Sequence, residues 1–182
     1  RLKDRKLPDC LKYIAVIESA LIPNALSSAK AYGPWQFIPA TATRYGLKRG
    51  PNWDERANFE KATDAALSYL DDNYERFGNW ALAIAAYNAG EANIESAIRR
   101  QKVDDYYGLW LPQETMQYNY RAIAAYLVMS KPELFGFSLK DADLYKWPQT
   151  KDEVFVLSKP QSVVELAVYF KVPVNEFLWL NP

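Results

Sequence analysis

Apolar residues near the start of the chain recur at steps of three and four positions, and this spacing predicts an amphipathic helix over residues 7–21. The stripe consists of Leu7, Leu11, Ile14 and Leu21. Pro8 is tolerated in a first helical turn, and Pro23 ends the pattern. Glu18 lies on the same stripe, although burying an unpaired carboxylate is costly. Glu18 is therefore the most informative position in this segment.

The same periodicity predicts further helices before Pro132. They are expected at 35–45, 63–77, 80–87, 94–98 and 115–129, with loops or irregular segments at 24–34, 47–61 and 104–113. Residues 80–87 are apolar on every side, so this helix is expected in the middle of a bundle, with Asn79 as its N-cap. Residues 1–135 are thus predicted to form one mainly α domain around a buried central helix.

The pattern changes after residue 135. Residues 136–150 show no clear periodicity and are predicted to be a linker, which leaves 151–182 as a small C-terminal appendage. Within the appendage, 154–157 is predicted to be a strand. Ser162-x-x-Glu165 is a capping-box signature for a helix, and a second short helix is expected from Pro173 to near Leu180. The positions of the first helix expected to face inward are Val163, Leu166, Ala167 and Phe170.

Composition narrows the chemistry available to the chain. Its 22 basic and 22 acidic residues balance, and no basic run suits a nucleic-acid backbone. The chain has no His, which excludes the Ser-His-Asp triad, the Cys-His pair and most zinc sites, and the single Cys10 allows no intrachain disulfide. Catalysis would therefore use carboxylates, Tyr, Lys or Ser. The aromatic content of 15% suits either a Tyr-rich core or a groove that stacks on sugars.

Two explanations fit a carboxylate on an apolar helix stripe. In the first, Glu18 lies at the edge of the stripe, where it is solvated or paired with a Lys. In the second, it faces a cleft whose apolar surroundings retain its proton, as a general acid needs near neutral pH.

Three motifs favour the second explanation. They are Ile17-Glu18-Ser19-Ala20 followed by Ser27-Ser28 and by Gly33-Pro34-Trp35-Gln36-Phe37-Ile38-Pro39-x-Thr41, then Ala86-Tyr87-Asn88-Ala89-Gly90-Glu91, then Leu111-Pro112-Gln113-Glu114-Thr115-x-x-Tyr118. In order and approximate spacing they resemble the three signatures of the soluble-type lytic transglycosylase family, which is related to goose-type lysozymes. The resemblance covers roughly residues 7–130 and implies a lysozyme-like helical fold.

The resemblance implies cleavage of the β-1,4 bond between N-acetylmuramic acid and N-acetylglucosamine in peptidoglycan. Glu18 would protonate the glycosidic oxygen and then accept a proton from the C6 hydroxyl of the sugar, which closes a 1,6-anhydro ring. No water, cofactor or metal is implied. One carboxylate suffices for this reaction, unlike the paired carboxylates of most glycosidases.

The resemblance also implies roles for the neighbours of Glu18. Ser27 and Gln36 would hydrogen-bond the sugar, and Tyr87 would orient the Glu18 carboxylate with Asn88 beside it. The remaining candidates are Glu114 and Tyr118 on the opposite wall, and Ser19 and Phe37 as supporting residues. Structural explanations stay open for four of these residues: bracing of the Glu18 helix by Ser19, packing beneath the groove by Phe37, a helix end at Asn88, and the core at Tyr118.

The chain departs from the family pattern in places. Pro34 stands where a larger aliphatic residue is more common, and 119–121 (Asn-Tyr-Arg) lacks a frequent Pro, which affects substrate fit more than the reaction. In the appendage, Val163-x-x-Leu166-Ala167 and Leu180-Asn181-Pro182 resemble part of a lysin motif, a small sugar-binding unit. Its usual Gly-Asp and its last strand are missing, so packing is preferred over glycan binding for this appendage.

Two other functions fit the same sequence. A hydrolytic muramidase on the same fold would need a second carboxylate to hold water, with Asp54, Glu55, Glu60 and Asp64 as candidates by position. A non-catalytic peptidoglycan-binding protein would have no reason to retain Glu18 on its stripe.

The expected partner is the glycan strand of peptidoglycan, with no nucleic acid, and the chain is predicted to be a monomer. No apolar run approaches the ~20 residues that span a bilayer. No signal peptide is present, and the abrupt start at Arg1 indicates a piece of something longer. The resemblance implies that the protein acts in the bacterial cell envelope or is secreted. Within the envelope it would be in the periplasm, and anchoring to the outer membrane through a preceding segment is one option.

Overall fold

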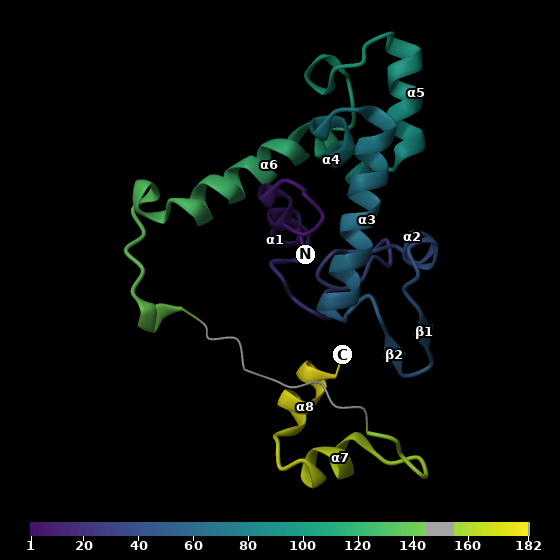
Figure 1. The fold of residues 1–182 in the computed structure, drawn as a ribbon, viewed down its shortest axis with the longest axis vertical. Helices are drawn as coiled ribbons and strands as arrows, with labels where there is room; N and C mark the ends of the chain where they lie inside the picture. The colour runs from purple at the N-terminus through teal and green to yellow at the C-terminus, as the bar shows by residue number, and fades with distance from the viewer. Residues whose placement is uncertain (145–154, 182) are drawn as a thin grey trace. The chain divides into compact units, whose positions relative to one another are not determined.

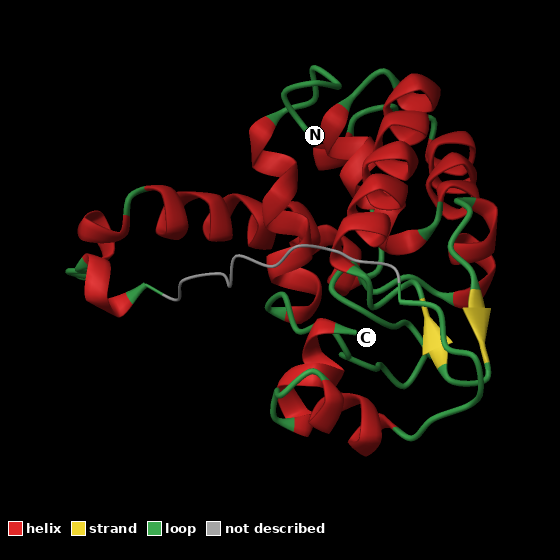
Figure 2. Ribbon diagram, turned by 60° about the horizontal axis from the view of Figure 1, so that its bottom comes forward, coloured by secondary structure: helices red, strands yellow, loops and turns green. Residues whose placement is uncertain are grey.

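Helices dominate the computed structural model, which describes residues 1–144 and 155–181 (Figure 1). The chain divides into two units, Arg1–Ser130 and Lys131–Pro182. The elements of the first unit are η1 (Asp9–Lys12), α1 (Tyr13–Ser19), α2 (Pro39–Arg44), β1 (Arg49–Gly50), β2 (Trp53–Asp54), α3 (Phe59–Phe77), α4 (Trp80–Ala89), α5 (Glu91–Gln101), η2 (Tyr106–Gly108) and α6 (Gln113–Ser130). The predicted mainly α class is confirmed, and Figure 2 shows the short β1–β2 hairpin as the described strands of this unit.

The first predicted helix is present but shorter than 7–21. It begins as the 3-10 turn η1 and ends at Ser19, because Ala20 adopts a left-handed conformation (φ 52°). Leu11 and Ile14 are 1% and 0% exposed, so the apolar stripe faces the core as its spacing predicts. Glu18 lies on the last turn, part-buried, at the point where this stripe leaves the core.

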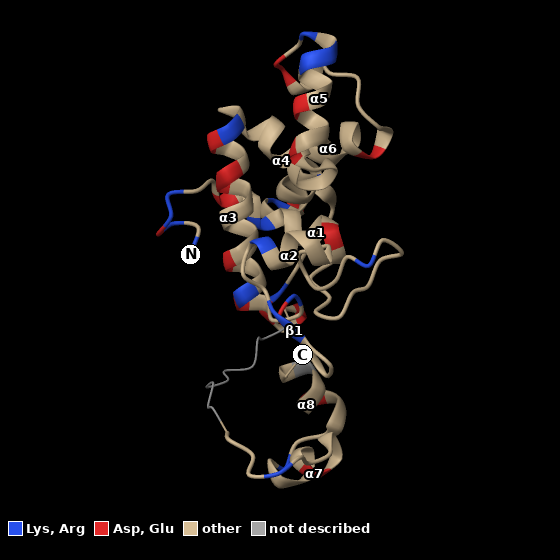
Figure 3. Cartoon of the chain, turned by 90° about the vertical axis from the view of Figure 1, so that its right-hand side faces the viewer, with Lys and Arg blue, Asp and Glu red and all other residues tan. Residues whose placement is uncertain are grey.

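The central helix α4 has the environment that its sequence predicts. Leu82, Ala83, Ala85 and Ala86 are buried, and the helix packs against α3, α5 and α6. The Asn79 side chain accepts hydrogen bonds from the backbone N–H groups of Ala81 and Leu82, which confirms the predicted N-cap. Figure 3 shows no Lys, Arg, Asp or Glu along α4, while α3 and α5 carry charged residues.

Two predicted helix starts in the first unit are wrong by four residues. The helix expected at 35–45 begins only at Pro39, because Gly33 and Gln36 take positive φ angles (87° and 49°) in the tight loop before it. Helix α3 begins at Phe59, four residues before the predicted start, because the Asn58 side chain caps it at Lys61.

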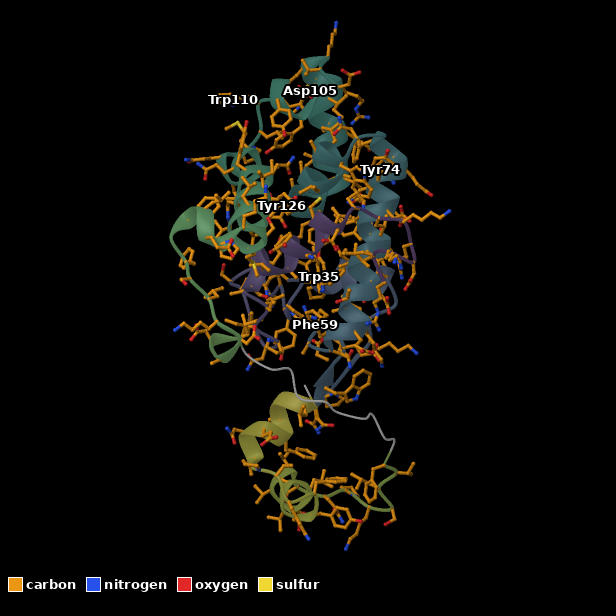
Figure 4. The ribbon with its side chains drawn as sticks, turned by 60° about the vertical axis from the view of Figure 1, so that its left-hand side comes forward. Trp35, Phe59, Tyr74, Asp105, Trp110 and Tyr126 are labelled. Carbon is orange, nitrogen blue, oxygen red and sulfur yellow. The ribbon has the colours of Figure 1, made fainter. Side chains whose placement is uncertain are left out.

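Arg56 holds the loop that precedes α2. Its side chain is buried, its Nη1 donates to the carbonyl oxygens of Lys30 and Phe37 at 2.9 Å each, and its Nη2 pairs with Asp54 at 2.7 Å. Loss of one partner from such a buried pair is strongly destabilising. The sequence pattern indicates no role for Arg56, because its partners belong to separate parts of the chain. Trp35, on the same loop, lies among side chains in the interior of the unit (Figure 4).

The second unit contains η3 (Pro132–Phe135), η4 (Asp141–Asp143), α7 (Val163–Tyr169) and α8 (Val174–Leu180). The capping box at Ser162 is confirmed by reciprocal hydrogen bonds with Glu165. Ala167 is buried, but Val163 and Phe170 are 39% and 43% exposed, so the predicted inward face is too wide for two short helices to cover.

The strand predicted at 154–157 is not found where the structure describes it. Residues 155–157 belong to no strand, and position 154 lies outside the described residues, as does 145–150 of the predicted linker. The domain boundaries drawn at 135 and 150 stay predictions. Among the helices of residues 1–144 and 155–181, none is long and apolar enough to span a membrane.

Candidate active site

A cleft of about 600 Å³ opens on the first unit, between the loop before α2 and the junction of α4, α5 and α6. It is lined by seven of the residues that the sequence singled out: Glu18, Ser27, Gln36, Phe37, Tyr87, Asn88 and Glu114. These residues come from α1, the 20–38 loop, the end of α4 and the first turn of α6. The fold therefore gathers residues that are nearly a hundred positions apart in the chain.

Glu18 lines this cleft, and its pKa lies near neutrality. Burial raises the pKa of Glu18 to about 7, while the hydrogen bond from Tyr118 and the positive charge of Arg121 lower it and the charge of Glu114 raises it. Near neutral pH the group is present both as an acid and as a carboxylate. A side chain with this pKa can donate a proton in one step and accept one in the next.

The tyrosine that orients Glu18 is Tyr118, and the prediction that Tyr87 does so is wrong. The Tyr118 hydroxyl donates to Oε1 of Glu18, whereas the Tyr87 hydroxyl donates to the carbonyl oxygen of Trp35 at 2.8 Å. The difference follows from packing, since α6 lies directly against α1. Tyr118 is 2% exposed and does not line the cleft wall as predicted but lies behind Glu18.

Gln36 and Ser27 hold the loop and also line the cleft. The Gln36 Nε2 donates to the carbonyl oxygens of Ala25 and Gly33 at 3.0 and 2.9 Å, and the Ser27 Oγ accepts from the Ala31 N–H at 3.0 Å. The side-chain amide oxygen of Gln36 and the hydroxyl proton of Ser27 have no hydrogen-bond partner among the described residues. Their predicted contacts with a sugar stay predictions.

The supporting residues join neighbouring segments. Ser19 donates to the carbonyl oxygen of Pro34 at 2.8 Å, so it braces the Glu18 helix against the loop. Phe37 is buried and packs edge-on against Tyr87, with ring centroids 6.2 Å apart.

Asn88 links the end of α4 to the start of α6. Its Nδ2 donates to Glu114 at 3.3 Å, and its Oδ1 accepts from the Thr115 hydroxyl at 2.9 Å. Both Asn88 and Glu114 line the cleft, and these two contacts fix where they lie.

A charged network on the far wall of the cleft was not predicted. Arg44 pairs with Glu91, whose other oxygen accepts from the Tyr69 hydroxyl at 2.9 Å, and the Arg44 hydrogen bond is the main reason that the pKa of Glu91 falls to about 2. The second motif includes Glu91, but its sequence does not identify partners on α2 and α3.

The four acids predicted as a possible second catalytic carboxylate do not line the cleft. They are engaged elsewhere: Asp54 pairs with Arg56, Glu55 with Lys61, and Glu60 and Asp64 with Arg1. Their positions in the sequence suggested proximity, but α3 turns Glu60 and Asp64 toward the N-terminus. Among residues 1–144 and 155–181, no group of three Cys, Asp or Glu side chains could hold a metal ion.

For the glycan cleavage that the sequence motifs imply, replacing Tyr118 by Phe is expected to lower the turnover about tenfold and to move the alkaline limb of the pH profile upward. The phenol stabilises the charged form of Glu18, and a hydrogen bond to a charged group contributes about 1.5–3 kcal/mol. Steady-state rates between pH 5 and 9 test this expectation. Tyr106→Phe is the matched control, because that buried hydroxyl bonds the carbonyl oxygens of Thr115 and Met116 instead. An unchanged limb in Tyr118→Phe would contradict the assigned contact.

This chain matches a family model and is similar to known proteins. The family model described as "Transglycosylase SLT domain" matches residues 1–109. Membrane-bound lytic murein transglycosylase D of Escherichia coli K12 is 38% identical over 148 residues, which cover 79% of this chain and 33% of that protein. The motifs predict this similarity. The chain therefore spans about a third of the length of this relative.

Two other proteins are similar to shorter parts of this chain. A putative tributyltin chloride resistance protein of Alteromonas sp. (strain M-1) is 36% identical over 102 residues, covering 56% of this chain and 49% of that protein. The peptidoglycan transglycosylase gp16 of Escherichia phage T7 is 38% identical over 89 residues, covering 47% of this chain and 7% of that protein.

Proposed function

This chain belongs to the transglycosylase SLT domain family, and we propose that it is a peptidoglycan lytic transglycosylase that cleaves the N-acetylmuramic acid–β-1,4–N-acetylglucosamine bond without water. The observation that carries the proposal is Glu18, a part-buried carboxyl with a pKa of about 7 that lines the cleft and is oriented by Tyr118.

In the first step, protonated Glu18 donates its proton to the glycosidic oxygen as the bond to the anomeric carbon breaks. The carboxylate then removes the proton from the C6 hydroxyl of the muramic acid residue, whose oxygen attacks the anomeric carbon and closes the 1,6-anhydro ring. Glu18 is protonated again at the end, so one carboxyl serves both steps. We assign the hydrogen-bonding of the sugar to the free polar atoms of Ser27 and Gln36, and the wall of the cleft to Tyr87, Asn88 and Glu114.

Hydrolysis on the same fold is the second candidate, and Glu114 is the observation that favours it. Glu114 lines the same cleft and its charge acts on Glu18, whereas the other acid there, Glu91, is engaged by Arg44 and Tyr69. A hydrolase needs a second carboxylate to activate water. Glu114, however, already accepts a hydrogen bond from Asn88, and we assign it to substrate positioning.

Mass spectrometry of purified cell walls digested by the chain distinguishes the two reactions. We expect muropeptides that end in 1,6-anhydro-N-acetylmuramic acid. They are about 18 Da lighter than the hydrolytic products, because no water is added. Products that carry reducing ends alone would show that the chain catalyses hydrolysis and not the proposed reaction. The absence of any cleavage, together with retained binding to the walls, would favour a non-catalytic peptidoglycan-binding protein.

We further propose that the chain acts in the bacterial cell envelope, or outside the cell, on glycan strands. Its relative in Escherichia coli is named as membrane-bound. An anchor for this chain would lie in a segment before Arg1. Action as a monomer is proposed because one unit contains the whole cleft.

A further inference from the structure

Arg121 lies on α6, one helical turn after Tyr118, and contacts the turn that carries Glu18. Its Nη2 donates to the carbonyl oxygen of Ile17 at 2.9 Å. Ile17 directly precedes Glu18 in the last turn of α1, where backbone carbonyls have no partner within the helix. Helix α6 therefore contacts this turn twice, through a phenol on the carboxyl and through a guanidinium on the backbone.

We propose that Arg121 is a positioning residue for the acid/base: it fixes the last turn of α1 through the Ile17 carbonyl and thereby holds a positive charge at the residue that precedes Glu18. This inference rests on the proposed function, because it concerns how one carboxyl serves first as acid and then as base.

The charges around Glu18 explain why a cation is needed there. Helix α6 presents Tyr118, Glu114 and Arg121 to Glu18, and α4 presents Tyr87. Within the described residues, Arg121 is the one cation that acts on the pKa of Glu18. Burial and Glu114 both disfavour the carboxylate that must form after the first proton transfer, and Arg121 acts against them.

Two substitutions test the charge of Arg121. Arg121→Gln removes the charge and, because its side chain is two atoms shorter, also the contact with the Ile17 carbonyl, whereas Arg121→Lys keeps the charge and an N–H donor. Activity requires Glu18 to begin protonated, so kcat/KM falls as the pH rises through the pKa of Glu18. Loss of the cation raises this pKa, so the alkaline limb of Arg121→Gln is expected to move upward by about half a pH unit or more. Arg121→Lys should keep the limb close to that of the unmodified chain.

The measurement is kcat/KM between pH 5 and 9 on solubilised glycan strands, with the melting temperature of each variant as a check on folding. Arg99→Gln on the exposed face of α5 loses the same charge away from the cleft and should leave the limb in place. A uniform loss of activity in Arg121→Gln with an unmoved limb would overturn the inference and leave Arg121 a structural contact. Absence of anhydro products from the unmodified chain would overturn the proposed function, and this inference with it.

Discussion

Replacing Glu18 by Gln is expected to reduce cleavage of purified cell walls by about a thousandfold and to leave glycan binding measurable. The amide has nearly the shape of the carboxyl and can still accept the hydrogen bond from Tyr118, but it can neither donate nor take a proton at neutral pH. Release of soluble muropeptides measures the rate, and co-sedimentation with cell walls measures the binding.

Glu60→Gln is the matched control for this experiment. Glu60 was a candidate second carboxylate, lies outside the cleft and pairs with Arg1 on an exposed surface, where such a pair contributes little to stability. Its variant should cleave at the normal rate. Equal cleavage by Glu18→Gln and the unmodified chain would remove Glu18 from the reaction, whatever its pKa.

The same Glu18→Gln variant should be more stable than the unmodified chain at alkaline pH. The pKa of Glu18 rises from 4.5 to about 7 on folding, so between these values the folded state binds more protons than the unfolded state. The contribution of Glu18 to stability is then complete below about pH 4.5 and is lost as the pH rises through 7. The full loss is at most about 3 kcal/mol. Denaturant unfolding at pH 4.5 and pH 8.5 should show the gain of the Gln variant only at the higher pH.

Local sequence predicted those parts of the site that depend on one segment. The spacing of Leu11 and Ile14 predicted which face of α1 is buried, and Glu18 falls on the same stripe at the next step after Ile14. The Asn79 cap and the apolar run after it predicted the central helix. In each case the relevant interactions are made within a few residues or with the core as a whole, so periodicity suffices.

Contacts between distant segments could not be predicted in the same way. Tyr87 and Tyr118 are both tyrosines in recognised motifs, and only the packing of α6 on α1 decides which of them reaches Glu18. Arg56 and Arg44 are unremarkable in the sequence, because their partners on other loops and helices become neighbours only in the folded chain.

Replacing Gly33 by Ala is expected to destabilise the first unit by about 3 kcal/mol or more and to abolish most activity. Gly33 has a φ of +87°, and a Cβ there would lie 1.8 Å from the carbonyl oxygen of Arg56. Neither atom can move freely, because Arg56 is anchored by its buried guanidinium and the Gly33 N–H donates to Ala25 at 2.9 Å. Any shift would also displace Gln36, which donates to the Gly33 carbonyl from within the cleft.

Gly46→Ala separates the close approach at Gly33 from the strain of a positive φ. Gly46 has a similar φ of +80°, but a Cβ there would meet nothing within 4 Å. An alanine in this conformation costs about 1–2 kcal/mol through backbone strain alone, so Gly46→Ala should lose that amount of stability and keep its activity. Denaturant unfolding and cell-wall digestion of both variants test the difference. Equal free energies of unfolding would show that the loop can yield around Gly33, and the rigid support inferred for Gln36 would then be wrong.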